Sequence, residues 1–418
     1  MEKFDSNEEE TASRVNRDHT QWRKLEQALE PYEKKLRAQE RLRRVLGIKE
    51  VERPTYERYI TRPISRHISR KNAFGAMVPN NPYGEDIRKR FKARTGFDDH
   101  MISLPYKELD PEDRFGQSLI KASNRLCAEY DPELLPVTPP EGRVLIKDIQ
   151  WMSRTIKKVA MLFGGELVRI TKIDPRWVYE DIEISHEFAI VVAIAHRPSL
   201  NQLAPSHFSH ASTTDAYSRL KVITTQLADF IRGIGYDAAV RETRGVAGPE
   251  LLMVPLAIDA GVGEFARNGR VLSPEFGINM RLKAVTTDLP LDADKPISFN
   301  THDFCMICEH CAVYCPANAI PYGPPTEEPP DDVFHNPGYT KWWTRADRCL
   351  FFQGANKRKW LGCGSRCIAV CPWNKNINLF HNTVRWMAIH MPRFIKKLLV
   401  WSDKVVYHRK KSIKKFYD

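Results

Sequence analysis

The stretch FCMICEHCAVYCP, residues 304–316, places four cysteines at the spacing C-x2-C-x2-C-x3-C-P. A second run contains Cys349, Cys363, Cys367 and Cys371 and also ends in a proline, Pro372. Proline interrupts local helix, so the last cysteine of each run can turn away from its own run. Only Cys127 lies outside the two runs, and it is expected to be an ordinary buried thiol.

Three kinds of site use cysteines in such numbers. Disulfide frameworks suit small secreted chains, and no secretory signal is recognised here. Zinc sites usually take paired C-x2-C hooks rather than a triplet that ends in Cys-Pro. The first run instead has the spacing by which bacterial-type ferredoxins hold iron–sulfur clusters. The second run is less regular, because Cys349 is remote and Cys363 and Cys367 are separated by three residues.

The resemblance to ferredoxins implies two [4Fe–4S] clusters with a crossover of the fourth cysteine. The ligands of one cluster would be Cys305, Cys308, Cys311 and Cys371, and those of the other Cys349, Cys363, Cys367 and Cys315. Such a chain would carry electrons one at a time.

Length and composition indicate a globular enzyme. The 418 residues leave room for two or three domains, and a hydrophobic content of 42% excludes wholesale disorder. The longest apolar run, residues 188–195, is too short for a membrane span. Because no apolar signal region or Tat signal is recognised, we expect a cytoplasmic protein unless an export signal has been removed.

The net charge of +12 is concentrated in the last part of the chain. Residues 385–418 hold ten Lys and Arg against two Asp and Glu. Apolar residues recur there at near-helical spacing, at Met391, Phe394, Ile395, Leu398, Leu399, Trp401 and Val405. A helix packed on the body with a solvated cationic rim is the favoured interpretation. Peripheral contact with an anionic membrane surface and docking of an acidic redox partner remain alternatives.

The pattern along the chain predicts four segments. A helical N-terminal extension occupies residues 1–55, with its apolar stripe broken at Pro31, and a core occupies residues 56–293. A cysteine domain follows at 294–380, and a basic helix or tail at 381–418. Within the core, helices are predicted at 147–163 and 211–233, and strands at 166–173, 188–196 and 236–242, whereas residues 51–140 give a weak signal. This mixture predicts an α+β fold.

Two common cofactor signatures are missing from the sequence. No G-x-G-x-x-G follows a predicted strand, so a nicotinamide or flavin site of the Rossmann type is not expected. No DxHxxG is present either; the nearest string, DDHMIS at 98–103, lacks the glycine. A cobalamin with a histidine on its lower face is therefore not expected.

Several motifs upstream of and around the cysteines occur together in one order. They are AGVGEFARNG (260–269), SPEFGINMR (273–281), TDLPL (287–291), Phe304-Cys305, Lys341-Trp342 and CPWNK (371–375). From about Ala211 to Asn376 the chain thus resembles the corrinoid-dependent reductive dehalogenases. The resemblance implies a nitroreductase-like core that holds base-off cobalamin and a ferredoxin-like domain that supplies its electrons. It also implies an organohalide substrate and a reduced ferredoxin or flavodoxin as donor.

The same resemblance implies roles for individual residues. Tyr217 matches the proton donor, and Arg267 matches the cation beside it, although Arg270 and Arg281 are alternatives for the cation. A guanidinium within reach stabilises the phenolate that remains after proton transfer. Without the family, Tyr217 reads as a packing residue that continues an apolar helix stripe. Gly277, Arg281 and Thr287 are expected to contact the cofactor.

Two other functions share some of these sequence features. Epoxyqueuosine reductase, a related cobalamin and iron–sulfur enzyme that acts on tRNA, would suit the positive charge. Its typical Gly-Trp-Ile-Gly-Lys string is replaced here by GEFAR at 263–267, so a nucleic-acid partner is not expected. A ferredoxin fused to a binding domain without catalysis would not need the matched core before the clusters.

Overall fold

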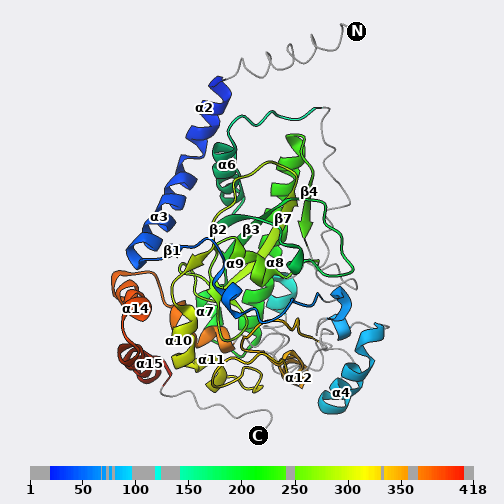
Figure 1. Ribbon diagram of the computed structural model, residues 1–418, viewed down its shortest axis with the longest axis vertical. Coiled ribbons are helices and arrows are strands. Elements are labelled where there is room, and N and C mark those ends of the chain that lie inside the picture. Colours follow the sequence, from blue (N-terminus) through cyan, green and yellow to red (C-terminus); the bar gives the residue numbers. More distant parts are fainter. Residues whose placement is uncertain are drawn as a thin grey trace.

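A computed structural model describes residues 19–66, 68–71, 75–77, 81–96, 118–123, 142–241, 250–330, 334–355 and 366–408. The predictions for Cys127, for Cys363 and for the DDHMIS string therefore fall outside the described residues. Within them the fold mixes helices and strands, as the α+β prediction requires (Figure 1).

The centre of the molecule is a four-stranded antiparallel sheet with the strand order β2-β3-β7-β4 (Figure 1). Its strands are β2 (Leu167–Lys172), β3 (Phe188–Ala195), β7 (Met280–Thr287) and β4 (Ala238–Arg241). The strands predicted at 166–173, 188–196 and 236–242 are confirmed. β7 was not predicted, because charged residues such as Arg281 and Lys283 interrupt its apolar pattern although it lies between β3 and β4.

Both faces of β3 are buried, which explains its unbroken apolar sequence. Ile190, Val192 and Ile194 enter one hydrophobic core, and Ala189, Val191 and Ala193 enter another. Since successive side chains of a strand point to opposite faces, one strand serves two cores.

Helices cover each face of the sheet. α6 (Ile149–Leu162) and α8 (His207–Gly233) pack on one face, and α9 (Met253–Asp259) packs on the other. Both predicted helices are thus confirmed, but α8 begins four residues earlier than expected. The side chain of Ser206 accepts a hydrogen bond from the backbone of Ser209 and forms a capping box, which fixes the earlier start.

The N-terminal part contains α2 (His19–Ala28) and α3 (Glu30–Leu46), which meet near Pro31 as the broken stripe predicts. α3 lies along the side of the core (Figure 1). A buried ion pair between Arg43 Nε and Glu275 Oε1, at 2.6 Å, fastens it there. β1 (Lys49–Glu50) then pairs with β8 (Ile297–Ser298), so the segment is tied to the chain just before the cysteines.

The cysteine segment consists of short elements rather than long ones. They are α10 (Thr301–Cys308), α11 (His310–Val313), α12 (Ala346–Ala355), α13 (Arg366–Ala369) and the 3-10 turn η8 (Pro372–Asn374). Trp373 is buried against Phe299 and Phe304. The Asn374 side chain accepts a hydrogen bond from the backbone of Ile278 at 2.8 Å, so the segment is joined directly to the core.

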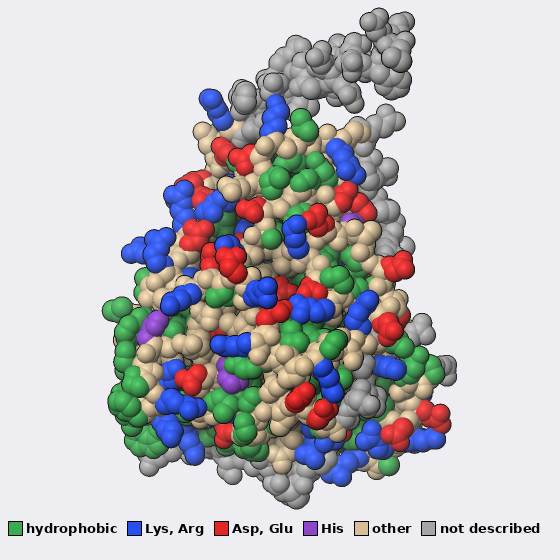
Figure 2. All heavy atoms as spheres, viewed as in Figure 1, with side chains coloured by type: hydrophobic (Ala, Val, Ile, Leu, Met, Phe, Trp, Pro, Cys, Tyr) green, Lys and Arg blue, Asp and Glu red, His purple; other side chains and the backbone are tan. Residues whose placement is uncertain are grey.

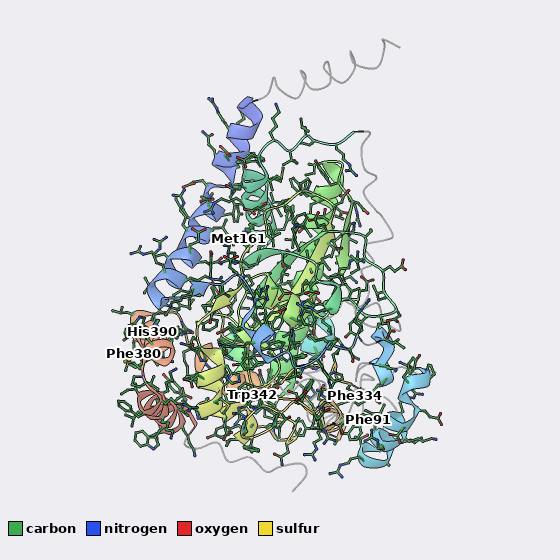
Figure 3. The ribbon with its side chains drawn as sticks, in the orientation of Figure 1. Phe91, Met161, Phe334, Trp342, Phe380 and His390 are labelled. Carbon is green, nitrogen blue, oxygen red and sulfur yellow. The ribbon has the colours of Figure 1, made fainter. Side chains whose placement is uncertain are left out.

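Other short elements complete the described chain. They are η1 (Thr55–Tyr59), η2 (Ser69–Lys71), η3 (Gly75–Met77), η4 (Pro82–Gly84), α4 (Glu85–Thr95), η6 (Pro175–Trp177), α7 (Pro198–Asn201), β5 (Glu264–Phe265) and β6 (Val271–Leu272). α4 was not expected, since only Ile87 and Phe91 give it an apolar face. Phe91 packs with Phe351 of α12, and Phe334 lies against the same group (Figure 3).

The last two helices of the described residues, α14 (Leu379–His390) and α15 (Arg393–His408), lie at one edge of the molecule (Figure 1). The expectation that the basic helix packs on the body is confirmed for one of its faces, where Lys396 Nζ lies 2.6 Å from Asp303. Of the helices in the described part of the chain, none combines the length and apolar composition that crossing a bilayer requires.

Candidate functional site

The structure brings together the four cysteines that were assigned to the first cluster. Cys305, Cys308 and Cys311 of α10 and α11 line one small cavity with Cys371, which comes from the second run. Cys371 thus lies beside three cysteines of the first run. Cysteine thiolates are the usual ligands of iron–sulfur clusters, so the donor set fits that cofactor.

A left-handed residue shapes the first run. Glu309, between α10 and α11, has φ = 51°, a conformation that non-glycine residues rarely adopt. Its carboxylate accepts a hydrogen bond from the backbone of Gly323 at 2.7 Å and lies 3.3 Å from Arg267 Nη2. These contacts hold the turn that aims Cys308 and Cys311 at the same cavity.

Burial has the largest effect on the pKa values of these thiols. It raises the pKa of Cys305 to about 11 and raises the pKa of Cys308 and of Cys311 well above the usual value. Binding to a cation would have to displace these protons. No three His, Cys, Asp or Glu side chains in the described ranges converge closely enough to hold a single metal ion.

A second group forms around Cys315, Cys349 and Cys367, which share a small hydrophobic core with Ala319 and Phe352. The fourth predicted member, Cys363, lies outside the described residues. The backbone N–H of Ala319 donates to Cys315 Sγ at 3.4 Å, and Gln353 Nε2 donates to Cys349 Sγ at 3.3 Å. Hydrogen bonds to sulfur are one of the factors that set the potential of a cluster.

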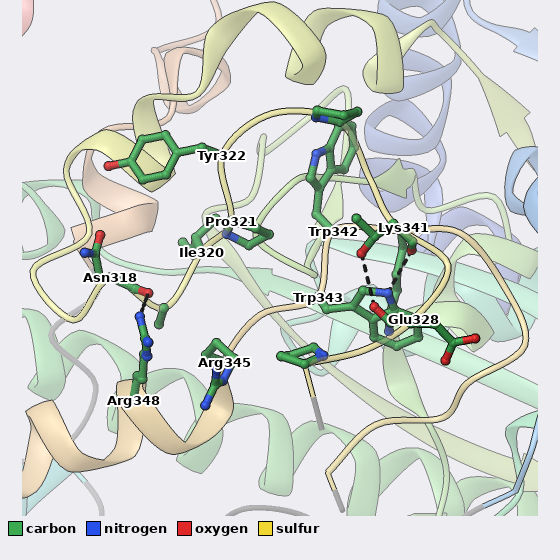
Figure 4. A pocket seen from close by; sticks show the side chains of 14 residues that line it. Asn318, Ile320, Pro321, Tyr322, Glu328, Lys341, Trp342, Trp343, Arg345 and Arg348 are labelled. Carbon is green, nitrogen blue, oxygen red and sulfur yellow. Dashed lines mark hydrogen bonds between the residues drawn. The ribbon is translucent and has the colours of Figure 1, made fainter. Parts of the chain in front are cut away.

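A hollow of about 450 Å³ adjoins this second group (Figure 4). Its wall includes Ala319, which contacts Cys315, and Arg348, which precedes Cys349 in the chain. Arg348 Nη1 donates to the carbonyl of Asn318 at 3.3 Å. The other lining side chains include Tyr322, Glu328, Lys341, Trp342, Trp343 and Arg345.

The Arg267 guanidinium contacts other groups than Tyr217, beside which the family resemblance implied it. The side chain is only 1% exposed and donates twice to the carbonyl of Cys305 and once each to the carbonyls of Pro321 and Gly323, at 2.9–3.1 Å. Its guanidinium also stacks over the Trp342 ring at 4.6 Å. These contacts join the Arg267 guanidinium to the first cysteine run and to the segment around Gly323.

The cation beside Tyr217 is Arg281. Its guanidinium carbon lies 5.0 Å from the centre of the Tyr217 ring. Tyr217 is on α8 and 44% exposed, so it does not pack in the core as the alternative interpretation held. Arg281 is the second residue of β7, next to the end of β3 with which it pairs at Ile194.

Buried polar groups surround this pair, and sequence reasoning missed them. Asn279 Nδ2 donates to the His196 carbonyl at 3.5 Å, so its Oδ1 accepts from Asn201 Nδ2 at 2.5 Å. Asn201 Nδ2 also donates to His196 Nδ1 at 3.0 Å. Burial, and then the charges of Arg281 and Arg270, lowers the pKa of His196 to about 2. The ring is therefore neutral, with its hydrogen on Nε2.

Some atoms in this region have no hydrogen-bond partner within the described part of the chain. They are His196 Nε2, Asn201 Oδ1, His210 Nδ1 and Arg281 Nε. Buried polar groups are nearly always hydrogen-bonded in native proteins. A polar ligand between the end of β3, the start of α8 and the start of β7 would satisfy them. No sequence motif marks this set, because His196 follows β3, Asn201 ends α7, His210 lies in the first turn of α8 and Arg281 belongs to β7.

The two remaining predicted cofactor contacts have other tasks in the structure. Gly277 has φ = 60°, and a side chain there would clash with Asn374 and with the Trp373 backbone. The absence of a side chain at Gly277 thus allows Asn374 and Trp373 to approach the backbone closely. Thr287 is fully buried at the far end of β7 from Arg281, and its hydroxyl donates to the Asp237 carbonyl at 2.6 Å. We therefore leave Gly277 and Thr287 out of the candidate site.

The chain is similar in sequence to two kinds of curated protein. No family model matches the chain. Over 306 residues the chain is 30% identical to a tetrachloroethene reductive dehalogenase of Sulfurospirillum multivorans. The aligned region is 64% of this chain and 59% of that protein. An epoxyqueuosine reductase of Lactococcus garvieae is 26% identical over 222 residues, 50% of this chain and 56% of that one.

Solved structures extend the likeness to most of the chain. A catabolic reductive dehalogenase in complex with 3-bromo-4-hydroxybenzoic acid superposes with a TM-score of 0.66 at 24% identity, over 89% of this chain and 50% of that one. A reductive dehalogenase whose structure suggests a mechanism for B12-dependent dehalogenation also gives 0.66, over 90% of this chain. The chain thus spans about half the length of these proteins. In sequence and in fold, it is related to the reductive dehalogenases.

Proposed function

We propose that this protein is a reductive dehalogenase that replaces a carbon–halogen bond by a carbon–hydrogen bond. The observation that carries the proposal is the sequence relationship to a curated reductive dehalogenase. The overall reaction takes up two electrons and one proton and releases a halide ion. The chain must therefore provide a route for electrons, a proton donor, and a place for the organohalide beside a reducing centre.

The proposed reducing centre is base-off cobalamin, in a core of the nitroreductase type. When bound, this cofactor would supply the low-potential metal at which the carbon–halogen bond is reduced. The buried polar atoms around His196, Asn201 and Arg281 fit a polar ligand of this kind. A structural relative acts by B12-dependent dehalogenation, which supports the same cofactor here.

Tyr217 is the proposed proton donor, with Arg281 in place of Arg267 as the cation. The phenol acquires negative charge as it gives up its proton, and a guanidinium 5.0 Å from the ring centre stabilises that charge. Arg is suited to the role because it stays charged even when partly buried. The 44% exposure of Tyr217 leaves the ring accessible for replenishing the proton from solvent.

Two [4Fe–4S] clusters in a ferredoxin-like domain are the proposed electron route. The cavity lined by Cys305, Cys308, Cys311 and Cys371 supports the first, and the packing of Cys315, Cys349 and Cys367 supports the second. Lys341, Arg345 and Arg348 around the hollow beside the second group would attract an acidic carrier. A reduced ferredoxin or flavodoxin is therefore the proposed donor.

The test uses the chain reconstituted with iron, sulfide and cobalamin. We expect about eight irons and one cobalt per chain, and release of halide from brominated phenols under a low-potential reductant. Tyr217→Phe should lower turnover at least about a hundredfold, within the range for a lost general acid, without changing the metal content. Halide release by Tyr217→Phe at the wild-type rate would remove Tyr217 as donor.

Tyr83→Phe is a matched control. Tyr83 is 42% exposed and also has a cation over its ring, Lys71 at 5.1 Å. This variant should keep full turnover. The alternative function predicts a different result: reduction of an epoxyqueuosine-containing tRNA stem-loop, with no halide release, would replace the dehalogenase proposal by that of an epoxyqueuosine reductase.

A further inference from the structure

The last described helix, α15, has two different faces. The inward face holds Lys396, Leu399, Val400 and Asp403, at the spacing of one side of a helix. Lys396 pairs with Asp303 at 2.6 Å, Asp403 pairs with Lys375 at 3.2 Å, and Leu399 and Val400 pack on the core around the first cysteine run. These contacts fix which side of α15 faces solvent.

The outward face of α15 is apolar. Phe394, Leu398, Trp401 and Val405 follow one another at spacings of four, three and four residues, so they form a single stripe opposite the inward face. They are 64%, 57%, 63% and 39% exposed. A packed helix normally turns such a stripe toward the core. Here the stripe is left on the surface.

α14 extends this apolar surface. Leu379 and Phe380, at its first turn, are 86% and 68% exposed, and Trp386 is 40% exposed. Between the two helices runs an apolar groove lined by residues that include Val384 and Val406. Figure 2 shows hydrophobic side chains gathered at the edge of the molecule where α14 and α15 lie, beside Lys and Arg side chains. Exposed apolar surface of this extent normally marks an interaction site.

The charges beside the stripe are positive. Lys397 and Lys404 are exposed on one flank of α15. The sequence that follows, RKKSIKKFYD (409–418), adds five further cations and one acidic residue. An apolar stripe with lysines along its flank is the composition of helices that lie in the interface of an anionic membrane. A protein partner with an apolar patch would gain nothing from this one-sided charge unless it were itself acidic.

We infer that α14 and α15 form a docking surface for an anionic lipid membrane. Phe394, Leu398, Trp401 and Val405 insert among the lipid headgroups, and Lys397 and Lys404 lie against the phosphates. Because both helices are at one edge of the fold, a flat bilayer can reach them without meeting the core (Figure 1). This inference is independent of the proposed catalytic function.

Flotation with lipid vesicles tests the inference on the full chain. The wild type should bind vesicles of equal parts phosphatidylglycerol and phosphatidylcholine, and bind pure phosphatidylcholine at least about tenfold more weakly. Leu398→Glu/Trp401→Glu should lose binding to both. Lys397→Gln/Lys404→Gln should weaken binding to the anionic vesicles by roughly thirtyfold at low salt, since each basic residue near the surface contributes about a factor of five.

The control places the same charges on another exposed apolar pair. Leu145 and Leu162, near α6, are 64% and 49% exposed, and Leu145→Glu/Leu162→Glu should bind like the wild type. Unchanged far-ultraviolet circular dichroism in all variants would show that they are folded. Three results would overturn the inference: no binding of the wild type to anionic vesicles, wild-type binding by Leu398→Glu/Trp401→Glu, or a dimer in solution that this variant makes monomeric.

Discussion

The sharpest prediction separates the two arginines near the candidate site. Arg267→Met should damage the fold around the first cysteine run, whereas Arg281→Met should leave the fold intact and lower turnover. The family resemblance implied the catalytic role for Arg267, with Arg270 and Arg281 as alternatives. The contacts of the two side chains favour Arg281.

The loss of stability expected for Arg267→Met follows from the contacts of the guanidinium. It is 1% exposed, makes four hydrogen bonds to three carbonyls, lies 3.3 Å from Glu309 and covers Trp342. A methionine side chain would pack as the aliphatic part of Arg267 does, but it would donate no hydrogen bond to the three carbonyls. Removing one partner from a buried charged network costs about 3–5 kcal/mol, less than the sum of the individual bonds because the neighbours relax.

Urea unfolding monitored by circular dichroism measures this loss, together with iron content. At a slope of about 3 kcal/mol per molar urea, the unfolding midpoint of Arg267→Met should fall by roughly 1–1.7 M. About four of eight irons should be lost, because the carbonyl of Cys305 is released. Arg281→Met, on a half-buried side chain, should move the midpoint by less than about 0.5 M and keep its iron while turnover falls at least about tenfold.

The control for charge is Arg267→Lys. A single ammonium cannot reach the three carbonyls that the planar fork bonds, so this variant should still be destabilised, by less than Arg267→Met. The reasoning is refuted if Arg267→Met keeps its midpoint and all its iron but loses turnover, since Arg267 would then act in catalysis as the sequence suggested.

Three further predictions concern how the segments are joined. Gly277→Ala, which forces a side chain against Asn374 at a positive φ, should lower stability by about 2 kcal/mol or more in urea unfolding, and an unchanged midpoint would contradict the close approach. Burial by itself would raise the pKa of Glu275, but the Arg43 guanidinium has the larger effect and holds that pKa below its ordinary value. The ion pair therefore stabilises the fold above the ordinary glutamate pKa, and this stabilisation is lost as the pH falls below about 4. Arg43→Met should lower the free energy of unfolding by about 3–5 kcal/mol at pH 7. Burial raises the pKa of Asp259 to about 7, so stability should decline as pH rises from about 4 to 7, by up to about 1.4 kcal/mol per pH unit, and Asp259→Asn should flatten that decline.

Secondary structure was predictable where one periodicity dominated a segment. β3 carries eight consecutive apolar residues because it faces two cores, and α8 carries an apolar stripe that ends in glycine. β7 was not predicted although it pairs with both β3 and β4, since its first half is only partly buried and tolerates Arg281 and Lys283. α4 escaped because two buried residues make too weak a pattern.

The resemblance to ferredoxins, and not the spacing, implied that Cys371 joins the first three cysteines, and the cavity that it lines with them agrees with that expectation. The sequence by itself determined that Cys305, Cys308 and Cys311 lie close together, since their spacing fixes how far apart they can lie along a turn, and that a proline follows Cys315 and Cys371. This information is local in the chain, and local geometry is what a sequence motif encodes.

Only the tertiary structure decided which polar groups meet at the candidate site. Tyr217 and Arg281 are 64 positions apart, and whether Arg267 or Arg281 reaches the ring depends on the pairing of β7 with β3. The same holds for Asn279, which bonds Asn201 and His196 across 78 and 83 positions of the chain and can do so only after the sheet has assembled. A single sequence does not state the register between distant strands, because that register is set by the packing of the whole core.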